Sequence, residues 1–579
     1  MVTDGNNSDA PPTPPAGFLR RYVLTERRTN HKTIGRNYLW LALFSVFLGM
    51  ILSLLMRLHL VWPAPQFPAL SRFGSTPDNL AALTLLHGSL MVFMVLIAAP
   101  QAGFGNYFLP IQIGARDMAF PTLNLLAFWS TVVSLLGMVA SFLLQGDAGI
   151  TVWIVSVTLF SAASLLNALN FSVTTIELRT KAMTLPRLPV TVWAWLINAL
   201  LSLLIFSILL AACVCLLADR LIGTAFFLPS TSIVYLSPRW TLPGQVLPSE
   251  WQQLFWFFAQ AEVYVAMLPC FGIVTHLLAT FSRRPVWRQR AVVLALCAIG
   301  LLGFCVWGQH MFASGMNPHS PLVFSALAAS LGLPASILLI SWLATLWKAK
   351  IELTTALLFA LGFVSLFAAG GLSGIFLARQ DLSSVAVSDE FVSGHYHLVM
   401  SVAATFAILG ALFFWFPKMF GRRLNERLGK AHFWLTFVGV YCVFMPMHWL
   451  GLLSHGQLAP EGSLAAVPFI RSFVSVAALL TIAAQGVFLF NFVGSLARGE
   501  VVDKNPWRAA TLEWSVPSPP PLENFTGFDP VVYREAYVIR GKSGEFVPQN
   551  VQPTPGEGRG PDPAAPARIP ASFPESAAS

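Results

Sequence analysis

The sequence predicts an all-α polytopic membrane protein, a bundle of about twelve transmembrane helices with both termini in the cytoplasm. Hydrophobic residues make up 55% of the 579 and charged residues only 11%, whereas a soluble domain carries about 25% charge. Apolar runs long enough to cross a bilayer as helices recur along the chain. They span residues 37–60, 79–104, 123–146, 151–175, 188–218, 253–281, 290–313, 322–347, 352–378, 395–417, 430–454 and 466–495.

The distribution of basic residues orients this bundle. Lysine and arginine concentrate in the N-terminal tail and in the alternate loops that share its side of the membrane, which the positive-inside rule makes cytoplasmic. The net charge of +9 is therefore a signal of topology, and it predicts contact with a lipid bilayer rather than with nucleic acid. The basic clusters are Arg20/Arg21/Arg27/Arg28/Lys32/Arg36, Arg179/Lys181/Arg187, Arg283/Arg284/Arg288/Arg290, Lys348/Lys350 and Lys418/Arg422/Arg423/Arg427/Lys430.

Composition divides the chain into four parts. Residues 1–34 form a polar, Pro-rich tail without the apolar stretch of a signal peptide, and residues 35–500 contain the helices. Residues 501–550 follow as a cytoplasmic C-terminal segment, and the Pro/Gly/Ala-rich residues 551–579 are expected to be disordered. All six cysteines fall in apolar runs without a CxxC pattern, so they are expected to be packing residues rather than disulfides or metal ligands.

Four histidines are expected at one depth of the bundle. The stretch VSGHYHLVM (392–400) holds His395 and His397, whose side chains would point about 200° apart on a helix. The topology places both in the outer third, together with His87 and His310. Any one of them alone could be a hydrogen-bonded core histidine. Neutral imidazole is the commonest metal ligand, and haem iron takes axial histidines. As a set they therefore indicate a cofactor site, with the tenth helix as a wall between two haems.

Longer motifs carry a family resemblance. They are LLHGSLMVFMVLIAAPQAGFGNYFLPIQIGARDMAFPTLNLLAFW (85–129), DRLIGTAFF (219–227), LFWFFAQAEVYVAMLPCFGI (254–273), GFCVWGQHMFASGM (303–316), SWLATL (341–346), GGLSG (370–374), GHYHLVMS (394–401), HFWLTFVGVYCVFMPMHWLGL (432–452) and NPWRAATLEWSVPSPPPLENF (505–525). Over roughly residues 35–530 the chain resembles cytochrome c oxidase subunit I, in the haem–copper oxidase family.

The resemblance implies two haems and a proton path. His87 and His397 match the axial ligands of the low-spin haem, and His395 matches the proximal ligand of the high-spin haem. An arginine near the low-spin haem corresponds to Arg57, and an acid near the reaction site corresponds to Glu262. The polar residues of a proton path from the cytoplasm match Asp117, Asn106 and Asn124. Without the resemblance, the loop that carries this path would be interpreted as a solvated turn with a capping asparagine.

The copper site departs from the family pattern. The family holds copper with three histidines, one in HPEVY and two in HHMF, whereas this chain has QAEVY and QHMF. Gln260 and Gln309 therefore replace two ligands, and His310 is the histidine that stays. Tyr264 is present, but the histidine to which the family bonds it is Gln260. Amide oxygen is a poor ligand for copper, so we expect no tightly bound copper.

Three further family features are missing. The lysine of a second proton path is Leu338, and the arginine pair that holds haem propionates is replaced by Gln457 and Leu458. The His-Asp pair that binds magnesium is replaced by Val387 and Ser388. Asp389, one residue away, could supply part of that magnesium site.

Two functions therefore compete. The first is that of an oxidase subunit I in the respiratory chain, which reduces oxygen with electrons that originate from cytochrome c and moves protons. The second is that of a paralogue which keeps the haems but acts in electron transfer, gas binding or complex assembly. The first implies partners similar to oxidase subunits II and III, and location in the bacterial cytoplasmic (inner) membrane. A nitric oxide reductase-like site also requires three histidines, and a transporter does not explain the haem-ligand pattern.

Overall fold

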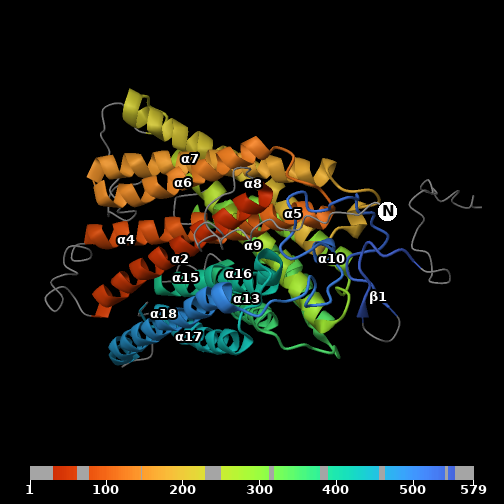
Figure 1. Ribbon diagram of the computed structural model, residues 1–579. Coiled ribbons are helices and arrows are strands. Elements are labelled where there is room, and N and C mark those ends of the chain that lie inside the picture. Colours follow the sequence, from red (N-terminus) through yellow and green to blue (C-terminus); the bar gives the residue numbers. More distant parts are fainter. Residues whose placement is uncertain are drawn as a thin grey trace, which may run out of the picture.

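The computed structural model describes residues 30–61, 77–144, 146–227, 249–311, 319–378, 389–454, 463–540 and 545–553. Over these residues the chain is a helical bundle (Figure 1). Eleven helices are long and apolar enough to cross a membrane, and the shorter helix Gln289–Cys305 is apolar as well. The predicted all-α, polytopic fold is confirmed.

The helices occur in the same order along the chain as the predicted apolar runs. In the first half they are α2 (His31–Val61), α4 (Pro77–Ser89), the π-helix η2 (Leu90–Gly105), α5 (Asn106–Ile113), α6 (Pro121–Leu144), α7 (Gly146–Glu177), the short η3 (Leu185–Arg187), α8 (Val190–Ile222) and α9 (Ser249–Ser282). In the second half they are α10 (Gln289–Cys305), η4 (Trp307–Met311), α11 (Ser320–Ser330), α12 (Gly332–Leu346), α13 (Thr355–Ala378), α15 (Asp389–Tyr396), the π-helix η5 (His397–Ser401), α16 (Val402–Phe420), α17 (Glu426–Ser454), η6 (Ser463–Ala466), α18 (Val467–Arg498), η7 (Leu512–Trp514) and the antiparallel strands β1 (Ile539–Arg540) and β2 (Glu545–Phe546).

Two of the crossings differ from regular α-helices. The second crossing continues from α4 through η2 into α5, so it reaches Ile113 rather than residue 104. Pro100 lies within η2, and because a proline cannot donate an N–H, it disrupts regular α-helical bonding. The tenth crossing also contains a π-helical turn, which begins at His397. Single π-helical turns inside α-helices are frequent at functional sites.

The helices lie side by side, with α9 inside the bundle (Figure 1). In the most apolar part of the span Glu250–Ser282, 89% of residues are buried, against 11% for the span Ser320–Leu346. Small residues permit close approach between helices, as membrane helix packing requires. A Cβ at Gly35 of α2 would lie 2.6 Å from the carbonyl oxygen of Gly103 in η2. The second crossing therefore packs directly on the first.

Both described ends of the chain meet at one end of the bundle. The ring of His31, the first residue of α2, lies 3.2 Å from Asn524 Oδ1 of the C-terminal segment. Lys32 Nζ donates to the carbonyl oxygens of Pro521 and Leu522. The helix therefore begins inside the stretch predicted as a polar tail ending at residue 34, because long-range contacts bury its first turn. The tail predicted for 551–579 lies almost wholly outside the described residues.

Candidate functional site

The three histidines predicted as haem ligands share one hydrogen-bonding arrangement. The Nδ1 atom lies 2.8 Å from the Gly49 carbonyl oxygen in His87, 2.7 Å from the Ser393 carbonyl oxygen in His397, and 3.1 Å from the Gly370 carbonyl oxygen in His395. A carbonyl can only accept, so each Nδ1 carries the proton. The lone pair of each neutral ring is therefore on Nε2. Metal-binding histidines are oriented in the same way, with the other ring nitrogen donating to a carbonyl or carboxylate.

Two histidines outside the predicted ligand set use both ring nitrogens. His31 bonds Asn106 and Asn524, and His448 bonds Phe444 and Ser373. For the three predicted ligands, no hydrogen bond to Nε2 occurs among the described residues. The ring nitrogens thus distinguish the predicted ligands from these two structural histidines.

The two predicted low-spin ligands come together from different helices. His87 at the end of α4 and Arg57 of α2 both interact electrostatically with His397. The ring of His397 stacks on that of Phe444 of α17, with centroids 4.6 Å apart and an interplanar angle of 11°. His395 turns instead toward α13, where it meets Gly370 and Ser373. The two histidines of GHYH therefore contact different helices, as their spacing predicted.

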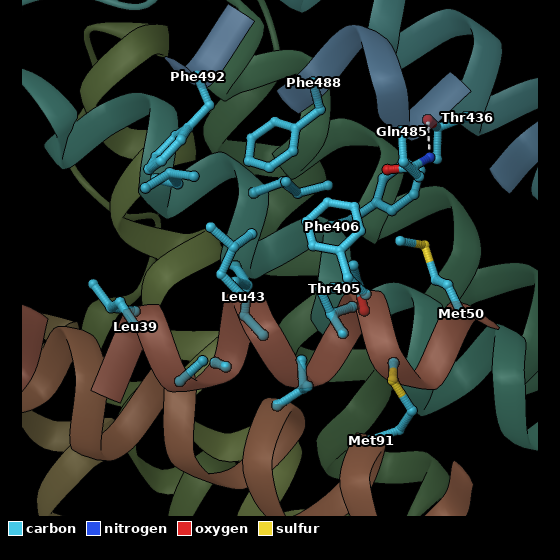
Figure 2. A pocket seen from close by; sticks show the side chains of 18 of the residues that line it. Leu39, Leu43, Met50, Met91, Thr405, Phe406, Thr436, Gln485, Phe488 and Phe492 are labelled. Atoms are coloured by element: carbon cyan, nitrogen blue, oxygen red, sulfur yellow. Dashed lines mark hydrogen bonds between the residues drawn. The ribbon is translucent and has the colours of Figure 1, made fainter. Parts of the chain in front are cut away.

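A cavity of about 260 Å³ reaches Met91 and Phe444, the neighbours of the two predicted low-spin ligands. Met91, one turn after His87, and Phe444 both line it. Figure 2 shows the aromatic side chains of Phe406, Phe488 and Phe492 around it, with α2 passing along one side. Its few polar groups include Gln485, whose Nε2 donates to Thr436 Oγ1 at 3.0 Å. The lining is suited to a large apolar group.

Gly49 allows the close contact between α2 and the second crossing. Its carbonyl accepts the His87 proton, and a Cβ at this position would lie 2.6 Å from the sulfur of Met91. The residue is therefore required by space rather than by backbone conformation.

The residues predicted to form a degenerate copper site lie where α9 packs on α10 and η4. Gln260 Nε2 donates to the Tyr264 hydroxyl at 3.2 Å, and the Tyr264 ring fills the space above Gly303. Gln309 belongs to η4, whose Trp307 packs on Phe257 of α9 with centroids 5.9 Å apart. The backbone of His310 is in η4, but its side chain lies outside the described structure, as do the side chains of residues 387–389 and of Gln457 and Leu458.

Glu262 of α9 interacts electrostatically with Tyr396, the tyrosine between the two histidines of the tenth crossing. The Oε1 atom of Glu262 is buried, and it has no hydrogen-bond partner among the described residues. A buried carboxylate oxygen without a partner is costly when ionised. This position therefore favours a protonated carboxyl group.

Comparison with known proteins now decides the family. The family model "Cytochrome C and Quinol oxidase polypeptide I" matches residues 33–489. This chain belongs to that family. It is 39% identical over 577 residues to the alternative cytochrome c oxidase subunit 1 of Bradyrhizobium diazoefficiens, covering 94% of this chain and 95% of the relative. It is 36% identical to the cytochrome c oxidase subunit 1 of Synechocystis, covering 88% and 91%. A solved heme-copper terminal oxidase dimer shares the fold, with a TM-score of 0.62, 14% identity and coverage of 82% and 84%.

Membership of the oxidase subunit I family implies haem cofactors, a multi-pass membrane location and assembly with other oxidase subunits. Family membership does not by itself assign the individual ligands, the copper status or the proton path, because this chain departs from the family pattern at several of those positions.

The predicted proton-path residues gather at the end of the bundle that is predicted to face the cytoplasm. Asn124 Nδ2 donates to Asn106 Oδ1 at 2.8 Å, and both side chains are buried. Asp117 Oδ1 accepts from the backbone N–H groups of His31, at 3.2 Å, and Met118, at 2.7 Å. Burial raises the pKa of the Asp117 carboxyl above its usual range, although these hydrogen bonds lower it. The structure therefore brings Asn106 and Asn124 together in the interior rather than in a solvated turn.

The position of the missing lysine is filled by apolar packing. Leu338 is fully buried, and the rings of Phe271, Trp342 and Phe367 pack on one another on the same side of the bundle, with centroids 5.2 to 6.1 Å apart. Trp342 Nε1 donates to Thr275 Oγ1 at 2.8 Å. Among these side chains no ionisable group takes the place of the lysine.

Sequence reasoning missed an ion pair near Arg57. Arg471 of α18 bonds Glu390 of α15 at 3.1 Å, and Glu390 also interacts electrostatically with Arg57. Arg471 itself could have indicated this ion pair. It lies near the predicted outer end of an apolar run, where the positive-inside rule makes basic residues rare.

Proposed function

We propose that this chain is the haem-binding subunit I of a respiratory oxidase complex in a bacterial cytoplasmic membrane. In this proposal His87 and His397 hold a low-spin haem, His395 holds a high-spin haem where oxygen is reduced, and Asp117 begins a proton path. The observation that carries it is the shared arrangement of the three histidines, each with Nδ1–H donated to a carbonyl. Partners similar to oxidase subunits II and III, with cytochrome c as the indirect electron donor, are part of the same proposal, which the relatives support by being named as subunit 1 of cytochrome c oxidases.

The residues present fit haem. The second and tenth crossings together supply three Nε2 lone pairs, and the cavity that Met91 and Phe444 help to line offers space with mainly apolar walls. Haem iron held by these ligands supplies a centre that accepts and passes on single electrons. Phe444 fixes the ring plane of His397 by stacking, and the Gly49 carbonyl fixes the tautomer of His87. Arg57, close to His397, supplies positive charge beside this site.

The residues present do not fit copper. The Gln260 amide donates to Tyr264, and Gln309 offers another amide where the family has imidazole. One histidine cannot hold copper against cellular competition. Copper therefore has no part in the proposed function. The same hydrogen bond between Gln260 and Tyr264 favours a second candidate, in which the high-spin site binds a gas or passes electrons without complete oxygen reduction.

Metal analysis of the purified complex tests both functions. We expect two haems per chain, and no copper in this subunit beyond that of any copper-bearing partner subunit. The double variant Gln260→His/Gln309→His is expected to raise copper by up to one ion per chain, with the partner's copper as a common background. An equal copper content in the two proteins, with copper in excess of the partner's own, contradicts the proposed site. Oxygen consumption by the parent separates the oxidase from the second candidate.

A further inference from the structure

The hydrogen bonds around His395 continue past the Gly370 carbonyl. Ser373 Oγ lies 2.9 Å from His395 Nδ1, and His448 Nε2 of α17 lies 3.1 Å from the same hydroxyl. His395, Ser373 and His448 thus form a row that crosses from α15 through α13 to α17. Neither Ser373 nor His448 has a role in the proposed function, although both lie beside a predicted haem ligand.

The direction of this row follows from donors and acceptors. His448 Nδ1 lies 2.8 Å from the Phe444 carbonyl oxygen, which can only accept, so the neutral ring presents a lone pair at Nε2. That lone pair requires the Ser373 hydroxyl proton. Ser373 Oγ then accepts from His395 Nδ1, which shares its proton with the Gly370 carbonyl at 3.1 Å. In the alternative, the hydroxyl turns to Gly370 at 2.7 Å and leaves His448 Nε2 without a donor.

Close packing holds His448 in place. A Cβ at Gly394 of α15 would lie 2.9 Å from His448 Nδ1 and 3.0 Å from the Phe444 carbonyl oxygen. Phe391 meets the His448 ring edge to face, with centroids 4.9 Å apart. The ring therefore has little freedom to turn away from Ser373.

Phe444 connects this row to the other predicted haem site. Its carbonyl oxygen anchors His448, while its ring stacks on His397. One residue of α17 thus supports the predicted ligands of both haems, through its backbone on one side and its side chain on the other.

We propose that Ser373 and His448 are positioning residues for the high-spin haem. They fix the ring plane of His395 and strengthen the hydrogen bond that its Nδ1–H donates, which increases the electron donation of Nε2 to iron. This inference rests on the proposed function, because it requires iron at His395. It adds two residues and a hydrogen-bonded row to that function.

Resonance Raman spectroscopy of the reduced complex provides the test. Ser373→Ala is expected to shift the stretching band of the bond between iron and His395 to lower frequency, and to lower high-spin haem retention about tenfold. Ser373→Thr keeps the hydroxyl and is expected to keep the parent band. Ser365→Ala is the matched control, because Ser365 of α13 makes a 2.8 Å bond to Tyr441 of α17 that touches no predicted ligand.

A second variant tests whether the two residues act in series. His448→Phe is expected to shift the band in the same direction, and Ser373→Ala/His448→Phe is expected to shift it no further than Ser373→Ala. A band unmoved by Ser373→Ala, or moved equally by Ser365→Ala, overturns the inference and leaves the proposed function standing. A parent complex without any such band overturns the proposed function and this inference together.

Discussion

At the scale of single residues, the ring nitrogens of histidine carry most of the functional information. Eleven histidines occur in the chain, and burial alone does not separate ligands from packing residues. The backbone carbonyl at Nδ1 matters because it fixes which nitrogen has the lone pair. His87, His395 and His397 satisfy this condition with Nε2 unbonded by the described residues, whereas His448 uses both nitrogens.

The low-spin site is tested by removing either ligand. We expect His87→Ala and His397→Ala each to abolish the optical and electron paramagnetic signals of a bis-histidine haem, because one axial ligand is lost. The haem at His395 is expected to stay measurable in both variants. His319→Ala is the control, since His319 is an exposed residue at the start of α11 and lines neither the cavity nor a predicted ligand site. An unchanged low-spin signal in either ligand variant contradicts the assignment.

A second prediction at this scale concerns Glu262. An ionised carboxylate at this depth costs on the order of 3 kcal/mol, and its Oε1 atom has no partner among the described residues. We expect an infrared band of a protonated carboxyl group that changes on haem reduction and disappears in Glu262→Gln. Glu250→Gln, at the exposed start of the same helix, is expected to keep the band. If the band does not change when the haem is reduced, Glu262 has a structural role and takes no part in proton transfer.

At the scale of elements, the sequence predicted the crossings better than their interior geometry. Apolar length is a local property, so the runs at 123–146 and 352–378 correspond to single helices. The run at 322–347 is divided between α11 and α12, and the second and tenth crossings contain π-helical turns. These irregularities depend on contacts with neighbouring helices, which apolar periodicity does not encode.

The contact between α15 and α17 provides a prediction for elements. We expect Gly394→Ala to push these helices apart, because the added Cβ would meet both His448 and the Phe444 carbonyl. Overpacking of this kind typically costs about 1–3 kcal/mol, and the thermal unfolding midpoint measures it. Both the low-spin spectrum and the iron–His395 band should change. Gly371→Ala on α13, where a Cβ meets nothing within 4 Å, is expected to leave all three readouts near the parent values.

At the scale of the whole molecule, the C-terminal segment packs against one end of the bundle. Glu513 of η7 is fully buried, and its Oε1 accepts from Gln112 Nε2 of α5 at 2.9 Å. The same Oε1 atom of Glu513 lies 3.7 Å from His276 Nε2 of α9. Burial raises the pKa of the Glu513 carboxyl above its usual range. A carboxyl group in this position therefore links the segment to two separate helices.

This buried acid predicts how stability depends on pH. Because the pKa of Glu513 is raised on folding, the folded state holds more protons than the unfolded state above pH of about 4.3. The free energy of unfolding should therefore fall as pH rises toward the raised pKa, by at most about 1.4 kcal/mol per pH unit. Glu513→Gln is expected to flatten this fall, as measured by thermal unfolding of the intact complex at several pH values. Exposed Glu500→Gln should keep the parent slope, and an equal slope in parent and Glu513→Gln contradicts the prediction.

The sequence by itself determined the membrane bundle, its expected orientation and the candidate ligands, because hydrophobicity, charge and motif spacing are written along the chain. The tertiary structure alone decided which ring nitrogen His87 and His395 present. The partners of His87 and His395 lie 38 and 25 residues away, on other helices. It also decided that Ser373 and His448 stand beside His395 and that the C-terminal segment buries the first turn of α2. Such pairings depend on how separate helices meet, and no local pattern specifies a contact between distant segments.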